Sequence, residues 1–359
     1  MKPMTKLTVF ILSLNTNLFA QTDWFWQNPL PQGNPLLDIH VFDQNTALAV
    51  GGTGTVMKTT DGGLNWHVQH NAGGTASFLI SVCFVPQGGT DTGWAVGADL
   101  FEGGGIILKT TDGGSTWSPQ ASGTTSFLTS VYFISENGTD TGWVVGGDGT
   151  ILKTTDGGST WSAQASGTTE GLNYVFFMDA DTGWAVGDFG TILKTTDGGN
   201  EWYAQFGGTT EDLYSVHFIP SGGTITGWAV GASGTILKTT DGGDNWSEEY
   251  SGTENNLLSV YFIGPDTGWA VGVSGTILKT TDGGTTWLAQ SSGTIDGLLS
   301  VYFVPQGGTY TGWTVGTNGT ILKTTNGGTT WPAQTSGTSV PLLSVYSIPR
   351  GDTQIGWAV

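Results

Sequence analysis

Six aspartates recur at one place in a repeated motif, and their carboxylates are the first candidates for chemistry. The motif is Thr-x-Asp-x-Gly-x-Thr-Trp, as in residues 154–161, and a seventh copy carries asparagine. The positions are Asp61, Asp112, Asp156, Asp197, Asp241, Asp282 and Asn326. Paired carboxylates could perform acid–base hydrolysis. Seven equivalent catalytic sites would serve no reaction, however, and Asn326 keeps an accepting oxygen without a titratable proton. We therefore interpret the motif as structural.

The tryptophan that ends each motif sets the period of the chain. It recurs every 41 to 51 residues, at Trp66, Trp117, Trp161, Trp202, Trp246, Trp287 and Trp331. The glycines favour positive φ, and the aspartate can accept backbone N–H groups inside the turn. The motif therefore predicts a tight hairpin whose tryptophan fills the space between strands.

The residues between the motifs predict the strands that position these hairpins. One unit reads as SVYF (259–262), GWAVG (268–272), GTILKTT (275–281) and a fourth strand opened by Trp287. A period of this length in short β segments is typical of propeller blades. We predict an all-β propeller of four-stranded blades, with seven complete repeats. Residues 344–347 and 356–359 supply two strands of a split or incomplete eighth, and residues 24–27 match the fourth-strand pattern. The ring is thus seven- or eight-bladed.

These motifs carry a family resemblance. The turn matches the Asp-box, also called the bacterial neuraminidase repeat. The blade pattern DTGWAVGxxGTILKTTDGGxTW resembles the photosystem II assembly and stability factor family over essentially all of residues 22–359. The resemblance implies an exported, non-enzymatic propeller that binds another protein and serves photosynthesis. That family is associated with an arginine-rich binding patch, whereas this chain has a single arginine, Arg350.

Departures from the repeat are the candidate binding residues. The second unit is longer between its second and third strands, and Asp99, Leu100, Phe101 and Glu102 form a tip that either contacts a partner or folds back on its own blade. The same face should collect further carboxylates. These include Asp148, Asp188, Glu211 and Asp212. These carboxylates could bind a basic protein surface or, weakly, Ca²⁺. The alternative is that they serve solubility alone.

One lysine also recurs in every unit. The seven lie on the predicted third strand, at Lys58, Lys109, Lys153, Lys194, Lys238, Lys279 and Lys323. They could form a ring that attracts anions. We favour the interpretation that they protect an outer strand against edge pairing.

The composition limits the partners and the chemistry. A net charge of −19 repels nucleic acid and anionic lipid, so neither is an expected partner. Cys83 is the only cysteine, and we interpret it as a strand residue. We expect no cofactor and no metal site. A single Arg argues against a sialidase, which grips its substrate carboxylate with three arginines, but composition leaves a glycosidase of neutral polysaccharides open.

The first twenty residues have the pattern of a secretory signal peptide. Lys2 and Lys6 precede a short apolar run, and cleavage is expected after Ala20. We predict that residues 1–20 are a signal peptide and 21–359 a single propeller domain. The protein would be periplasmic, at the cell surface or extracellular.

The sequence therefore favours a non-enzymatic scaffold that binds or assembles another exported or membrane protein, without inserting into the membrane itself. One alternative is a carbohydrate-binding or glycosidase-like Asp-box propeller, so a glycan partner stays open. Another is a cell-surface protein whose C-terminal sorting segment lies beyond Val359.

Overall fold

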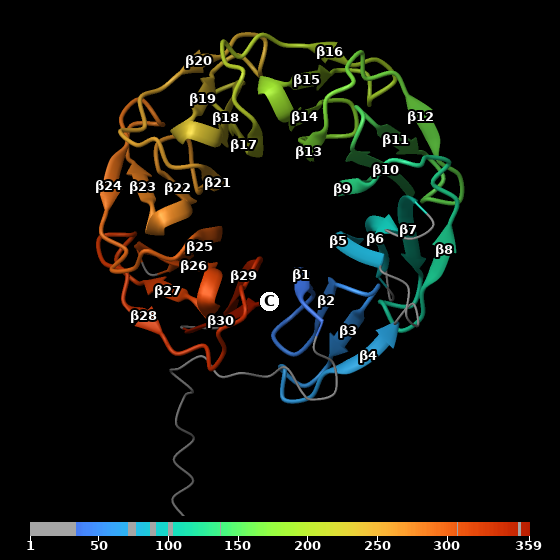
Figure 1. Ribbon diagram of the computed structural model, residues 1–359, viewed down its shortest axis with the longest axis horizontal. Helices are drawn as coiled ribbons and strands as arrows, with labels where there is room; N and C mark the ends of the chain where they lie inside the picture. The colour runs from blue at the N-terminus through green and yellow to red at the C-terminus, as the bar shows by residue number, and fades with distance from the viewer. Residues whose placement is uncertain are drawn as a thin grey trace, which may run out of the picture.

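The strands of this protein are arranged as a propeller. The computed structural model describes residues 34–70, 77–86, 91–99, 103–136, 138–306, 308–350 and 353–359. Their strands form seven four-stranded antiparallel sheets and one two-stranded sheet, placed around a common axis (Figure 1). We number the four-stranded sheets blades 1 to 7 in chain order. The prediction of an all-β propeller with four-stranded blades is confirmed.

Within each blade the chain runs from the axis to the rim. The first strands lie innermost (Figure 1). They are β1 (Leu36–Val41), β5 (Ser77–Val85), β9 (Leu128–Glu136), β13 (Leu172–Phe177), β17 (Leu213–Ser221), β21 (Leu257–Phe262), β25 (Leu298–Gln306) and, in the two-stranded sheet, β29 (Val345–Arg350). The second strands are β2 (Ala47–Gly51), β6 (Thr92–Asp99), β10 (Thr139–Gly146), β14 (Gly183–Gly187), β18 (Thr224–Gly231), β22 (Gly268–Gly272), β26 (Thr309–Gly316) and β30 (Thr353–Ala358).

The outer half of each blade is shorter. The third strands are β3 (Val56–Thr59), β7 (Gly104–Thr110), β11 (Ile151–Thr154), β15 (Ile192–Thr195), β19 (Ile236–Thr239), β23 (Ile277–Thr280) and β27 (Ile321–Thr324). The fourth strands are β4 (His67–His70), β8 (Ser118–Gln120), β12 (Ser162–Gln164), β16 (Tyr203–Ala204), β20 (Ser247–Glu248), β24 (Leu288–Gln290) and β28 (Ala333–Gln334). Single 3₁₀ turns precede four third strands: η1 (Asp188–Gly190), η2 (Ala232–Gly234), η3 (Val273–Gly275) and η4 (Thr317–Gly319).

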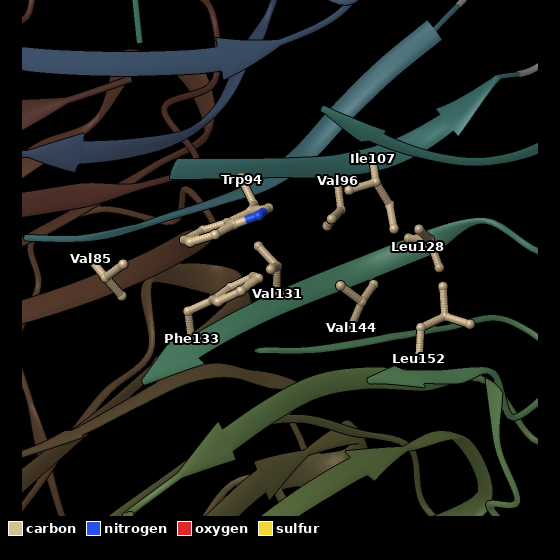
Figure 2. Close-up of a cluster of buried hydrophobic side chains, with 9 residues drawn as sticks. All are labelled: Val85, Trp94, Val96, Ile107, Leu128, Val131, Phe133, Val144 and Leu152. Carbon is tan, nitrogen blue, oxygen red and sulfur yellow. The ribbon is translucent and has the colours of Figure 1, made fainter. Parts of the chain in front are cut away.

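The hydrophobic core lies between blades. The second strands are apolar on both faces, and β14 and β22 are buried along their whole length. One cluster joins Val85, Trp94 and Val96 of blade 2 to Val131 and Phe133 of blade 3 (Figure 2). Because each blade has two apolar faces, a blade is stable only between neighbours.

A pair of stacked rings recurs at the junctions. The Trp94 indole of blade 2 lies flat on Phe133 of blade 3, with ring centroids 3.4 Å apart and planes 8° apart (Figure 2). The edge of Phe133 then meets Trp161, the last residue of the repeated motif. The same stack recurs in Trp143–Phe177, Trp184–Phe218, Trp228–Phe262 and Trp269–Phe303. The motif tryptophan is thus the third ring of an inter-blade contact.

The two-stranded sheet lies between blade 7 and blade 1, where the ring closes. At four junctions a serine of one first strand accepts a backbone N–H from the next, as Ser130 does from Val175. At the closure Asp38 of β1 takes this position. Its carboxylate accepts the Val82 N–H at 3.0 Å and the Ser344 hydroxyl of the chain before β29 at 3.1 Å. One carboxylate therefore connects the two ends of the ring.

The strand boundaries differ from the prediction by one or two residues, since β21 begins at Leu257 rather than Ser259 and β23 ends at Thr280 rather than Thr281. The predicted third strand began at Gly275, whereas β23 begins at Ile277. Gly275 belongs to η3, with φ of 67°, and a residue in this conformation cannot continue an extended strand. The predicted fourth-strand match at residues 24–27 and the signal peptide lie outside the described residues.

Candidate functional site

Each repeated motif folds into a hairpin turn held by its own aspartate. In blade 3, Asp156 Oδ1 accepts the Thr160 N–H at 2.9 Å, and Oδ2 accepts the Thr160 hydroxyl at 2.7 Å. The Thr154 hydroxyl donates to Asp156 Oδ1 and accepts the Gly158 N–H, both at 2.8 Å. Both carboxylate oxygens are therefore occupied within the turn.

These hydrogen bonds stabilise the charged form of the carboxylate. The Thr160 N–H and hydroxyl lower the pKa of Asp156 to about 2, despite some opposing desolvation. Asn326 makes the same turn: its Oδ1 accepts the Thr330 N–H, and its Nδ2 donates to the Thr330 hydroxyl. Since an amide serves equally well, the turn needs hydrogen-bond acceptors rather than a proton donor or base.

Four of the recurring lysines, Lys58, Lys153, Lys194 and Lys238, connect their blade to the turn of the next. Lys58 Nζ of blade 1 donates to the Gly113 carbonyl in the blade 2 turn at 2.6 Å. Lys153 reaches Asn200, and Lys194 forms an ion pair with Asp244 at 2.5 Å. The interpretation of these lysines as protection of an edge strand is wrong, because the third strand pairs with a neighbour on each side. These four lysines are inter-blade contacts.

The opposite face holds the turns between second and third strands and the loops that lead to the next blade. Asp148, at φ of 53°, accepts the Ser126 hydroxyl at 2.8 Å. It belongs to blade 3, and Asp99 ends β6 of blade 2. Strands β6 and β7 pair as far as Asp99 and Gly104. Residues 100–102, at the predicted tip, lie outside the described residues.

The structure brings three of the predicted carboxylates together between blades 4 and 5. Asp212 accepts the Phe189 N–H at 2.9 Å, and Glu211 accepts the Ser233 hydroxyl at 2.9 Å. Asp188 accepts an N–H of the Asn173 amide at 2.9 Å. Partial burial raises the pKa of Tyr214, and the negative charges of the three carboxylates raise it further. We name Asp188, Glu211 and Asp212 the acidic cluster.

Exposed aromatic side chains also lie on blade 4, which holds Asp188 of the acidic cluster, and the sequence prediction missed them. Phe189 is 68% exposed, Phe206 86% and Tyr174 38%. All three belong to blade 4 or to the loop that leaves it. The signal that could have found them is the repeat itself, because blade 4 has an aromatic residue where most other blades have small or polar ones.

The described residues offer little basis for metal chemistry. No group of three or more His, Cys, Asp or Glu in this part of the chain is placed to hold a metal ion. Burial raises the pKa of the Cys83 thiol to about 12, so this cysteine stays protonated. No helix in the described part is long and apolar enough to span a membrane.

The fold and the repeated turns define a class: a β-propeller of tandem four-stranded blades with polar loops on one face. A family model described as photosynthesis system II assembly factor YCF48 matches residues 13–101, 90–165, 112–205, 164–251 and 249–341. The chain therefore belongs to this family. A search of curated proteins gives no match.

Solved structures share the fold. A structure titled "YCF48 bound to D1 peptide" has 23% identity and a TM-score of 0.62, covering 82% of this chain and 94% of that one. YCF48 from Cyanidioschyzon merolae has 22% identity and a TM-score of 0.61, covering 82% and 97%. An ancestral GH74 enzyme has 15% identity and a TM-score of 0.62, covering 93% of this chain but 50% of that one.

Proposed function

We propose that this protein is an exported, non-enzymatic scaffold that binds another protein during assembly, in the manner of the photosystem II assembly factors. The observation that carries the proposal is the acidic cluster, which lies beside the exposed Phe189 on the loop face. Membership of the YCF48 family supports the same function. One of the similar structures is YCF48 bound to D1 peptide. The partner would be an exported or membrane protein with a basic surface.

The repeated turns would then be Asp-boxes with a structural role. Every carboxylate oxygen of Asp156 already has a partner inside the turn, and Asn326 replaces aspartate without loss of the turn. The sheet of β29 and β30 would be the inner half of an eighth blade, since β29 lies beside β25 and β1 as the other first strands lie beside theirs. Export rests on the charged and apolar pattern of residues 1–20.

A carbohydrate-binding propeller is the second candidate, because exposed aromatic rings such as Phe206 and Tyr250 could stack on sugar rings. The fold likeness to a GH74 enzyme is compatible with it, although this chain spans half of that enzyme's length. We rank it second because the family match to an assembly factor runs from residue 13 to residue 341, whereas the likeness to the GH74 enzyme is one of fold at 15% identity.

Affinity capture tests the proposed function. Tagged residues 21–359 are the bait for envelope extracts of the source cell, and any captured protein is purified and titrated against the bait by calorimetry. The control bait carries Asp188→Asn, Glu211→Gln and Asp212→Asn, which keep the hydrogen-bonding shape without the charge. We expect a captured protein to bind directly, and to bind the control bait about tenfold more weakly. Capture of polysaccharide alone, or equal affinity for both baits, contradicts the proposal.

A further inference from the structure

Blade 4 has aromatic residues at three positions of the repeat where most other blades have small or polar ones. Tyr174 stands where the other first strands have Asp38, Ser81, Ser130, Ser215, Ser259, Ser300 and Ser344. Phe189 stands where other turns have Thr53, Asp148, Ser233, Ser274 and Asn318. Phe206 stands where other loops have His70, Ala121, Ala165, Tyr250, Ser291 and Thr335. Because at least four other blades form the same fold with a small or polar residue at each position, the fold does not require these rings.

The three positions follow one radius of the loop face. Tyr174 lies on the innermost strand, Phe189 in the turn η1, and Phe206 after the outermost strand β16. The Tyr174 side chain is 38% exposed on that strand, so part of its ring is open to solvent. In blade 5, Tyr250 repeats the position of Phe206 and is 87% exposed. We name Tyr174, Phe189 and Phe206 the aromatic stripe.

The acidic cluster runs alongside this stripe. The loop from Phe206 to Asp212 begins at the outer ring and ends where Asp212 accepts the Phe189 N–H. Halfway along, the Thr209 carbonyl lies against Gly190 of the Phe189 turn. Within the described residues, no lysine or arginine forms an ion pair with Asp188, Glu211 or Asp212. The stripe is therefore an apolar surface beside unpaired negative charge.

We propose that the aromatic stripe and the acidic cluster together bind an extended, basic polypeptide segment of the partner. Apolar side chains of the segment pack on the three rings, and its lysine or arginine side chains pair with the carboxylates. Exposed aromatic rings are typical of binding anchors, and the negative field excludes nucleic acid and acidic peptides. This inference rests on the proposed function and specifies its site and the chemistry of its partner.

The test substitutes the residues that neighbouring blades already use. Phe189→Ser copies Ser233 of blade 5, and Phe206→Ala copies Ala165 of blade 3, so both should leave the fold intact. The matched control is Ile295→Thr, which removes an equally exposed apolar side chain, 89% exposed, from the loop before blade 7. Thermal unfolding of all variants checks that stability is unchanged.

The probe is a fluorescent synthetic peptide of about 12 residues in which lysine alternates with leucine and glycine, compared with its glutamate counterpart and with cellohexaose. We expect the lysine peptide to bind wild type and Ile295→Thr equally, and the Phe189→Ser/Phe206→Ala double variant at least about tenfold more weakly. Affinity should fall with salt, and the glutamate peptide should not bind.

Three results would overturn the inference: equal binding of the lysine peptide to wild type and double variant, equal binding of both peptides, or binding of cellohexaose that the double variant loses. Envelope capture separates this failure from failure of the proposed function. If the double variant captures and binds the same protein as wild type, the stripe is not the site but the scaffold function stands. If wild type captures no protein, the scaffold function fails whatever the peptide shows.

Discussion

At the scale of single residues, the turn aspartate acts as a hydrogen-bond acceptor. Asp156→Asn should change the free energy of unfolding by less than about 1 kcal/mol, because Asn326 already makes this turn. Asp156→Ala should lower the free energy of unfolding by about 1–2 kcal/mol. The reason is that the Thr160 N–H loses its side-chain acceptor, as a backbone N–H does when a helix cap is removed. Urea unfolding of both variants measures the difference. Equal losses for Asn and Ala would show that the charge, not the acceptor geometry, supports the turn.

Asp38, at the closure of the ring, should make stability depend on pH. Burial raises its pKa to about 6, against the opposing hydrogen bonds from Val82, Ile39 and Ser344. The folded state then holds the proton more strongly than the unfolded state, whose pKa is 3.8. The contribution of Asp38 to the free energy of unfolding therefore falls as pH rises from about 4 to about 6, by about 1–3 kcal/mol.

Asp38→Asn isolates this contribution. His40 and His217, whose pKa values burial lowers to about 4, act in the opposite direction over the same range. They are unchanged in the variant, so the difference between the two stability curves reports Asp38. We expect the stability of the variant, relative to that of wild type, to increase as pH rises from 4 to 6.5. Thermal unfolding at each pH measures this difference. A constant difference across this range would mean that Asp38 titrates normally.

At the scale of strands, the glycine that ends six of the second strands, as Gly187 ends β14, is required by a close approach of two backbones. A Cβ at Gly187 would lie 2.0 Å from the Gly171 carbonyl oxygen, which accepts the Asp188 N–H. Gly187→Ala must therefore displace the start of β13, at a cost of about 1–3 kcal/mol. Gly264→Ala, in open space, is the control and should be neutral. Urea midpoints compare the two, and a neutral Gly187→Ala would refute the steric argument.

At the scale of the whole molecule, the closure of the ring should be its weakest junction. Trp66 and Trp357 meet there edge to face, at 5.9 Å, in place of the stacked Trp–Phe pair of other junctions. The β29–β30 sheet has two strands rather than four, so it buries fewer side chains. Amide hydrogen exchange should be faster in β1, β29 and β30 than in β21, β22 and β23. Uniform protection around the ring would contradict this expectation.

Much of the fold could be predicted from the sequence because the signals are local. The turn around Asp156 depends on residues within a few positions of one another, and GWAVG at 268–272 became β22 without adjustment. The start of β23 could not be placed as well, because η3 needs Gly275 in a left-handed conformation that several glycine-rich sequences could adopt.

The repeat unit can be read from the amino-acid sequence, because the all-β blade, its period and its hairpin turn arise from contacts within one repeat. How the units meet becomes visible in the folded ring. The ring places Lys58 on the next blade's turn, Trp94 on Phe133, and Asp38 at the closure. It also brings Asp212 to Phe189, which defines the candidate site. The physical reason is that blades bury their faces only against each other, so contacts between blades exist only once the ring has formed.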